Sequence, residues 1–271
     1  MEITASDGAA IRFEERGAGD DVLLLIHGHP FDRSMWRPQL EAAAAAGWRA
    51  IAPDLRGYGA SGGGGDKVTL DMFAEDLAIL LDRLEVPDAV VGGLSMGGQI
   101  AMEFCRSRPE RVRGLLLAAT SPRAETEEGK EVRRLTADRL LAEGMEAYAE
   151  ELLPRMLAPG SIAEGPALAG YVLGMMRSAP AGGAAAALRG RAERPPYEPV
   201  LQGLDVPGLV VVGDEDAFTG REDADLMHRL LRGSELLWLE GVGHMPNLEE
   251  PNLFNAALVA LLHRVSEGKA G

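Results

Sequence analysis

The sequence of 271 residues is poor in several features that define large classes of protein. It has one cysteine, Cys105, which excludes an intramolecular disulfide framework and a thiol-rich metal site. Its 27 lysines and arginines are outnumbered by 42 aspartates and glutamates, and the net charge of -15 argues against a nucleic-acid partner. The longest apolar runs, such as Leu115 to Ala119, are much shorter than the roughly 20 residues that a membrane-spanning helix needs.

The amino terminus lacks the pattern of a targeting segment. Residues Met1 to Asp7 have no basic start and no apolar core, so no secretory signal is visible. We therefore expect a cytoplasmic protein without a membrane partner. The acidic excess is most simply explained by solubility, and Cys105 by packing as a small buried hydrophobe.

The sequence does contain a regular alternation of strand patterns and helical patterns, and 46% of its residues are hydrophobic, enough for one large core. This alternation predicts right-handed crossovers and a mostly parallel sheet with helices on both faces. The expected strands are two within residues 1–17 and one each in 21–26, 49–53, 89–94, 112–119, 209–212 and 236–239. The expected helices of this part are 34–46 with Ser34 as its cap, 69–84, one directly after Ser95, 226–231 and 252–264.

The alternation stops between Ser121 and Pro207, where no strand pattern appears and the composition turns to Ala, Glu, Arg, Leu and Met. Helical spacing is found in residues 134–141, 145–156, 168–176 and 184–188, with breaks expected at Pro159-Gly160 and at Pro180. We therefore predict an α/β core formed by residues 1–121 and 207–271. Residues 122–206 are predicted to form an inserted helical cap instead of a second domain.

The segment Gly93-Leu94-Ser95-Met96-Gly97 joins a strand pattern to a helical one. A serine between two such glycines is typically held in a strained conformation, with its oxygen exposed above the sheet. The glycines allow the strand and helix backbones to approach. The positive end of the following helix would stabilise an oxyanion that develops beside the serine.

A serine hydroxyl is a weak nucleophile unless a base accepts its proton and a third group orients that base. Open parallel sheets place their sites at the carboxyl ends of strands, so the partners are sought there. Asp216 follows the first of the last two strand patterns, and His244 follows the second. The neighbouring Asp214 and Glu215 stay open as alternatives for the acid.

The chain order Ser95, Asp216, His244 resembles that of the α/β-hydrolases. In particular, the sequence resembles the group that includes 3-oxoadipate enol-lactonases, bacterial esterases and cofactor-free haloperoxidases. The matching segments follow the order of that family over nearly the whole chain: His27-Gly28-His29-Pro30, Pro53 to Ser61, Gly93 to Gly97, Gly213 to Asp216, and Gly243-His244. The resemblance implies the α/β-hydrolase fold, with an eight-stranded, mostly parallel sheet and an inserted helical cap.

The resemblance also implies a role for each site residue. Ser95 would be the nucleophile, His244 the general base and then acid, and Asp216 the carboxylate that orients His244. The backbone N-H groups of His29 and Met96 would form the oxyanion hole. No cofactor and no metal are expected.

Two other histidines have simpler explanations than metal binding. His27 is expected to form structural hydrogen bonds at the end of its strand. At His29 the family often has an aromatic or bulky residue, and an imidazole there could contact polar atoms of the substrate. A zinc site needs three or four ligands, and no thiol or carboxylate cluster completes one here.

These observations predict a carboxylic-ester hydrolase that cleaves a small-molecule ester or lactone through an acyl-enzyme on Ser95. A carbon-carbon bond or thioester hydrolase with the same triad is one alternative, as is perhydrolysis. Another is a non-hydrolysing binder or cyclase-like auxiliary of a small-molecule pathway. The sequence makes no prediction for the natural substrate, the shape of the cap pocket or the oligomeric state.

Overall fold

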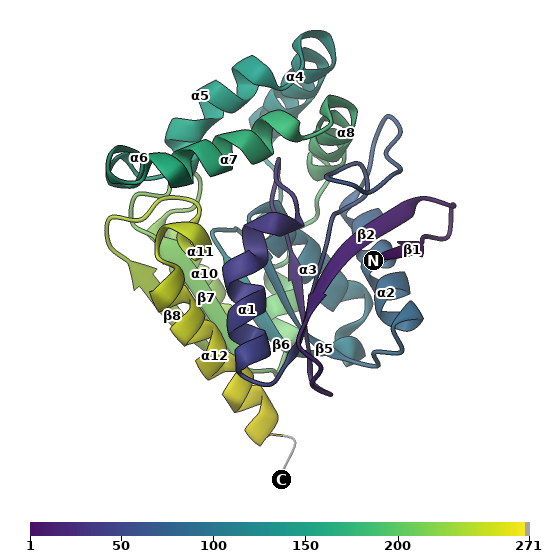
Figure 1. Cartoon of the computed structure of the whole chain (residues 1–271), viewed down its shortest axis with the longest axis vertical. Coiled ribbons are helices and arrows are strands. Elements are labelled where there is room, and N and C mark those ends of the chain that lie inside the picture. Colours follow the sequence, from purple (N-terminus) through teal and green to yellow (C-terminus); the bar gives the residue numbers. More distant parts are fainter. Residues whose placement is uncertain (269–271) are drawn as a thin grey trace.

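An eight-stranded sheet forms the centre of the computed structural model, which describes residues 1–268 (Figure 1). The strand order is β1-β2-β4-β3-β5-β6-β7-β8. The pairs β1–β2 and β2–β4 are antiparallel, and all other pairs are parallel, which confirms the predicted mostly parallel sheet. The strands are β1 Glu2–Thr4, β2 Ala10–Arg16, β3 Val22–Ile26, β4 Arg49–Pro53, β5 Ala89–Leu94, β6 Val112–Ala118, β7 Gly208–Gly213 and β8 Ser234–Leu239.

Helices cover both faces of this sheet (Figure 1). In β3, Leu23 and Leu25 pack into one hydrophobic cluster and Leu24 and Ile26 into the other, because successive side chains of a strand point to opposite faces. The first cluster includes residues of α1 (Arg37–Ala45) and α12 (Pro251–Glu267); the second includes residues of α2 (Leu70–Arg83), α3 (Met96–Ser107) and α10 (Arg221–Leu230). None of the helices within residues 1–268 is long and apolar enough to cross a membrane.

The start of the first predicted helix differs from the expectation. A short 3-10 helix, Arg33–Trp36, precedes α1, and its N-cap is Asp32, whose side chain accepts a hydrogen bond from the backbone N-H of Ser34 at 2.8 Å. Ser34 as the cap was therefore wrong. An aspartate is as good an N-cap as a serine, and Asp32 stands two residues earlier in the chain.

The predicted helical insertion is present between β6 and β7. Residues 122–206, all of them described, contain six helices and no strand: α4 Glu127–Glu143, α5 Glu146–Met156, α6 Pro159–Glu164, α7 Pro166–Ser178, α8 Ala181–Arg191 and α9 Glu198–Gly203. Helices α4 to α8 form a layer of their own at one end of the sheet (Figure 1). In it α4 packs against α8 and α5 against α7, whereas α9 packs beside the sheet against α3 and α10.

Three short helices were not predicted from the sequence: α6, α9 and α11 (Pro246–Glu249). The break expected at Pro159-Gly160 lies just before α6, between the end of α5 at Met156 and the first turn of α6, which contains Pro159. Proline is favoured there because the N-H groups of the first turn have no intrahelical acceptor, so a residue without an N-H loses no hydrogen bond. The three helices have only four to six residues each, too few for a recognisable apolar period.

Helix α8 contacts the loop after β4 through a close backbone approach. A Cβ atom added to Gly183 would lie 1.8 Å from the carbonyl oxygen of Gly57. The backbone N-H of Val68, in the same loop, donates to the carbonyl oxygen of Ala186 on α8 at 3.0 Å. Helix α8 can therefore pack this closely against the core only because residue 183 has no side chain.

We expect Gly183→Ala to lower the free energy of unfolding by about 1–3 kcal/mol, because the added methyl meets rigid backbone. Gly182→Ala is the matched control, since no atom lies within 4 Å of its added Cβ. Thermal denaturation of both variants measures the difference. Equal midpoints for the two variants would contradict the close approach.

Candidate active site

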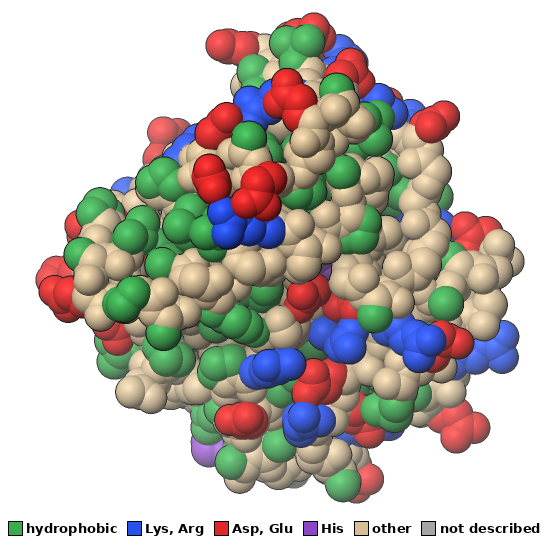
Figure 2. Space-filling model, turned by 45° about the horizontal axis from the view of Figure 1, so that its top comes forward, with side chains coloured by type: hydrophobic (Ala, Val, Ile, Leu, Met, Phe, Trp, Pro, Cys, Tyr) green, Lys and Arg blue, Asp and Glu red, His purple; other side chains and the backbone are tan. Residues whose placement is uncertain are grey.

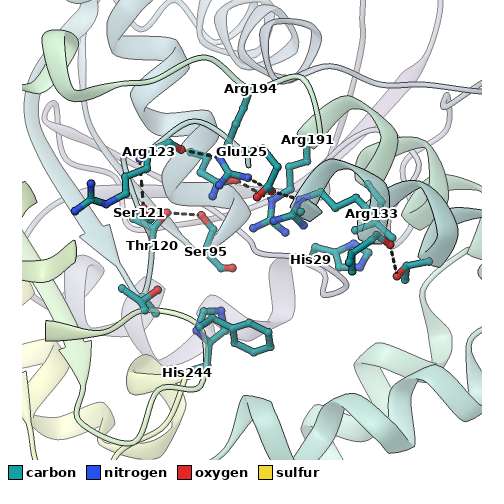
Figure 3. A pocket seen from close by; sticks show the side chains of 18 of the residues that line it. His29, Ser95, Thr120, Ser121, Arg123, Glu125, Arg133, Arg191, Arg194 and His244 are labelled. Carbon is teal, nitrogen blue, oxygen red and sulfur yellow. Dashed lines mark hydrogen bonds and ion pairs between the residues drawn. The ribbon is translucent and has the colours of Figure 1, made fainter. Parts of the chain in front are cut away.

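A cavity of about 460 Å³ lies between the loops at the carboxyl ends of the strands and the layer of inserted helices. Ser95 and His244 both line it, and Figure 3 shows the two side chains on neighbouring walls. His29 and Thr120 come from the loops after β3 and β6. The loops therefore bring three of the predicted site residues, His29, Ser95 and His244, to one cavity.

Ser95 lies at the sharp turn between β5 and α3. Its backbone has φ 56° and ψ -116°, a left-handed conformation that costs a non-glycine residue about 1–3 kcal/mol. Two hydrogen bonds hold this conformation: Ser95 N donates to the carbonyl oxygen of Ala118 at 2.9 Å, and Thr120 Oγ1 donates to the carbonyl oxygen of Ser95 at 2.7 Å. The expected strained serine is confirmed.

The glycines around Ser95 are needed because the backbones nearly touch. A Cβ atom on Gly93 would lie 2.2 Å from the carbonyl group of Gly97, and one on Gly97 would lie 2.1 Å from the carbonyl oxygen of Ile26. Helix α3 begins at Met96, so the first N-H groups of this helix have no intrahelical acceptor. The turn thus places the positive end of a helix next to Ser95.

His244 and Asp216 are joined by a hydrogen bond. His244 Nδ1 lies 2.8 Å from Asp216 Oδ1 and 2.9 Å from Oδ2, and both side chains are almost fully buried. Asp216 Oδ1 also accepts hydrogen bonds from the backbone N-H groups of Phe218 and Thr219, at 2.8 and 3.1 Å. Because the carboxylate is an acceptor for two fixed donors, it keeps its orientation towards the imidazole.

The two alternative acids lie elsewhere. Asp214 is exposed, and its Oδ1 accepts a hydrogen bond from the backbone N-H of Gly241 at 2.7 Å. Glu215 is also exposed. Of the three acids after β7, only Asp216 contacts His244.

The loop that carries His244 is tied to the inserted helices. The backbone N-H of His244 donates to the carbonyl oxygen of Met156, the last residue of α5, at 3.0 Å. Glu249 Oε2 accepts hydrogen bonds from the N-H groups of Gly243 and Ala158 at 3.1 and 2.8 Å. The sequence contains no indication of this role for Glu249. Some of its partners are more than 80 residues away, and the others are backbone groups of its own turn, which no side-chain pattern reveals.

His27 has the structural role that the sequence suggested. It is fully buried; its Nδ1 donates to the carbonyl oxygen of Gly28 at 2.8 Å, and its Nε2 accepts from the backbone N-H of Leu55 at 2.9 Å. An imidazole with one donor nitrogen and one acceptor nitrogen is in its neutral form. Burial lowers the pKa of His27.

The imidazole of His29 is also occupied by the protein. Its Nδ1 lies 2.8 Å from the hydroxyl of Tyr58, and its Nε2 lies 3.1 Å from the hydroxyl of Tyr148 on α5. Burial holds the pKa of His29 well below its ordinary value, and the nearby charges of Arg191 and Arg133 lower it further. Both ring nitrogens therefore have a tyrosine hydroxyl as partner.

The inserted helices also contribute charge that the sequence analysis missed. Five arginines line the cavity, namely Arg123, Arg133, Arg155, Arg191 and Arg194. They lie on α4, on α5, at the end of α8 and in the adjoining loops, so their convergence depends on tertiary packing. Within residues 1–268, no group of three or more His, Cys, Asp or Glu side chains is arranged to hold a metal ion.

The alpha/beta hydrolase family model matches residues 23–257, most of the chain. The chain belongs to this family. It is therefore an enzyme of the hydrolase class, and its sheet and helices have the α/β-hydrolase fold that the sequence predicted.

Three similar proteins match over nearly their whole length. A 3-oxoadipate enol-lactonase from Acinetobacter baylyi is 28% identical over 97% of this chain and 96% of its own. A non-heme chloroperoxidase from Kitasatospora aureofaciens is 29% identical over 96% of this chain and 98% of its own. The structure of a thermophilic esterase from Thermogutta terrifontis, solved with malate bound, is 38% identical and superposes with a TM-score of 0.93 over 98% of both chains.

The lowered pKa values of His27 and His29 predict a loss of stability in mild acid. Below their ordinary pKa of 6.5 the unfolded chain binds protons that the folded chain does not, so stability is present above that pH and falls as the pH falls. Each such proton contributes a slope of about 1.4 kcal/mol per pH unit. His29→Gln should therefore lose less stability than the wild type between pH 7.5 and about 5.5.

Urea unfolding at the two pH values measures this difference. His263→Gln is the matched control, because it makes the same exchange at a histidine that is exposed on α12. The same decline in all three proteins would show that His29 takes up a proton as readily in the folded state as in the unfolded one.

Proposed function

We propose that this hydrolase cleaves a carboxylic ester or lactone of a small molecule through an acyl-enzyme on Ser95. His244 acts as the base, and Asp216 orients it. The observation that carries the proposal is the hydrogen bond between Asp216 and His244, at a cavity that also holds a serine in a strained turn. The names of the similar lactonase and esterase support the same reaction class.

The hydrogen bond to Asp216 gives His244 its function. A proton on Nδ1 directed at the carboxylate leaves Nε2 as the acceptor of the neutral imidazole. Nε2 then takes the proton of the Ser95 hydroxyl while Oγ bonds to the substrate carbonyl carbon. It gives that proton to the leaving alkoxide as the carbon-oxygen bond breaks, and a water molecule activated in the same way releases the acid and regenerates Ser95.

The negative charge that develops on the carbonyl oxygen needs donors beside Ser95. In this proposal they are the backbone N-H groups of Met96, at the start of α3, and of His29, in the loop after β3. Donors of this kind contribute about 10²- to 10³-fold to turnover. The bonds from the His29 ring to two tyrosine hydroxyls fix the residue that carries the second donor.

Residues 122–206 act in this proposal as the cap that selects the substrate. Their helices supply the wall of the cavity opposite the strand ends, including Tyr148, Leu152 and Met156 of α5. They also fix the loop of His244 through the bond to Met156.

We expect Ser95→Ala to lower kcat on a short p-nitrophenyl ester by at least about 10³-fold, since the nucleophile is lost. It should also abolish covalent labelling by a fluorophosphonate probe. Ser121→Ala is the matched control, because Ser121 lines the same cavity and its variant should still be labelled. A wild-type chain that neither turns over esters nor reacts with the probe would favour a non-hydrolysing binder.

A second pair of variants tests the acid. Asp216→Asn should lower kcat by about 10³- to 10⁴-fold with little change in KM, because the amide no longer favours the productive tautomer of His244. Asp214→Asn should change kcat less than about 10-fold, since Asp214 bonds only to backbone near Gly241. Steady-state kinetics on the same ester measures both, and equal losses would refute the assignment of Asp216.

A further inference from the structure

The cavity carries an excess of positive charge in a chain whose net charge is -15. Five arginines line it, against two carboxylates, Glu125 and Asp223. On the outer face in Figure 2, acidic and basic side chains are interspersed. Figure 3 shows Arg133, Arg191 and Arg194 gathered on the wall beyond Ser95, on the side away from His244.

Most of these arginines have partners that explain their presence. Arg133 and Arg194 both form ion pairs with Glu125 Oε2. Arg123 is exposed and forms ion pairs with Glu222 and Asp223. Arg155, also exposed, lies over the ring of Phe218 at 4.2 Å from its centroid.

Arg191 differs from the others because no carboxylate within residues 1–268 pairs with it. Its Nε donates to Gln99 Oε1 at 2.8 Å, and no described residue accepts a hydrogen bond from its two terminal nitrogens. The side chain is half-buried and lines the cavity. Burial lowers its pKa well below the ordinary value, and so do the charges of Arg133 and Arg194. A partly buried cation without a counter-ion is costly, and the two terminal nitrogens of this guanidinium are available to bind an anion.

Its position relative to Ser95 is fixed by α3. Gln99 is buried in the first turns of that helix, and its backbone N-H donates to the carbonyl oxygen of Ser95 at 3.2 Å. Both residues line the cavity. The amide of Gln99 thus holds the guanidinium of Arg191 at the cavity that Ser95 also lines. An anion bound there occupies the same cavity as a carbonyl group placed at Ser95.

We propose that Arg191 binds a carboxylate of the substrate, so that the enzyme acts on esters or lactones that carry a free carboxylate, such as half-esters of dicarboxylic acids. The two terminal nitrogens of a guanidinium match the two oxygens of a carboxylate. This inference rests on the proposed ester hydrolysis and specifies its substrate class. Arg191 is a specificity-determining residue in it, and Gln99 is the residue that positions Arg191.

The test compares esters that differ only in charge. Hydrolysis of monomethyl succinate, glutarate and adipate is followed by pH-stat, each beside the methyl ester of the monocarboxylic acid with the same number of carbons. For at least one pair, the wild type should prefer the anionic ester in kcat/KM by about 10- to 100-fold, the range of hydrogen bonds to a charged group. Arg191→Gln should lose that preference.

The matched control is Arg189→Gln, which removes the same charge from α8 but from an arginine that pairs with Asp138 and does not line the cavity. It should keep the wild-type preference. Arg191→Lys, which keeps the charge without the fork of two nitrogens, should give an intermediate ratio, and it serves in place of Arg191→Gln if circular dichroism shows that variant unfolded. A preference that persists in the folded Arg191 variants, or that is absent from the wild type for every pair, would overturn the proposal.

Binding without turnover separates this inference from the proposed function. In Ser95→Ala, calorimetric titration with the dicarboxylates succinate, glutarate and adipate should show binding that a further Arg191→Gln exchange weakens about 10-fold or more. If the wild type hydrolyses no ester but dicarboxylates still bind in this Arg191-dependent way, the proposed ester hydrolysis is contradicted and the anion site is supported. If inorganic phosphate binds as tightly as every dicarboxylate, and with the same dependence on Arg191, the assignment to a carboxylate is wrong.

Discussion

The close approach of strand β5 and helix α3 around Ser95 is the constraint on which the rest of the site depends. Gly93 and Gly97 permit it, since a methyl group on either would collide with backbone. The left-handed conformation of Ser95 costs about 1–3 kcal/mol, and it persists because Ala118 and Thr120 of the neighbouring β6 segment hydrogen-bond to it. The turn that carries the hydroxyl is therefore tied by hydrogen bonds to the middle of the parallel sheet.

His244 is held differently, because its loop depends on contacts with the inserted helices. The carboxylate of Glu249 accepts hydrogen bonds from N-H groups of the His244 loop and of the segment after α5. The carbonyl oxygen of Met156 accepts a hydrogen bond from the N-H of His244 itself. The same helix α5 presents Tyr148 to the ring of His29. The insertion is thus part of the framework that orients the groups around Ser95, and a change in its packing reaches the chemistry through these hydrogen bonds.

The parts that could be predicted from sequence are those encoded by neighbouring residues. The strand patterns, the glycines around Ser95, and the placement of Asp216 and His244 directly after strands all lie within short windows. The residues alone left Asp214 and Glu215 open beside Asp216, because the three acids are neighbours in the chain, and only the family resemblance favoured Asp216. The convergence of Arg133, Arg191 and Arg194 had no local signal, since it arises where α4, the end of α8 and the loop beyond it meet over the strand ends.

The charge of the whole chain and that of the cavity have opposite signs, and they act over different distances. Exposed carboxylates are screened within roughly 8 Å at physiological ionic strength, so the net charge of -15 repels an anion only near the surface. Inside the cavity the effective dielectric constant is lower, and a guanidinium without a carboxylate partner attracts an anion more strongly. An acidic composition is therefore no obstacle to an anionic substrate. Whether such a site prefers an anionic substrate depends on the positions of one or two arginines without carboxylate partners, and the net charge of the chain is a poor guide to that preference.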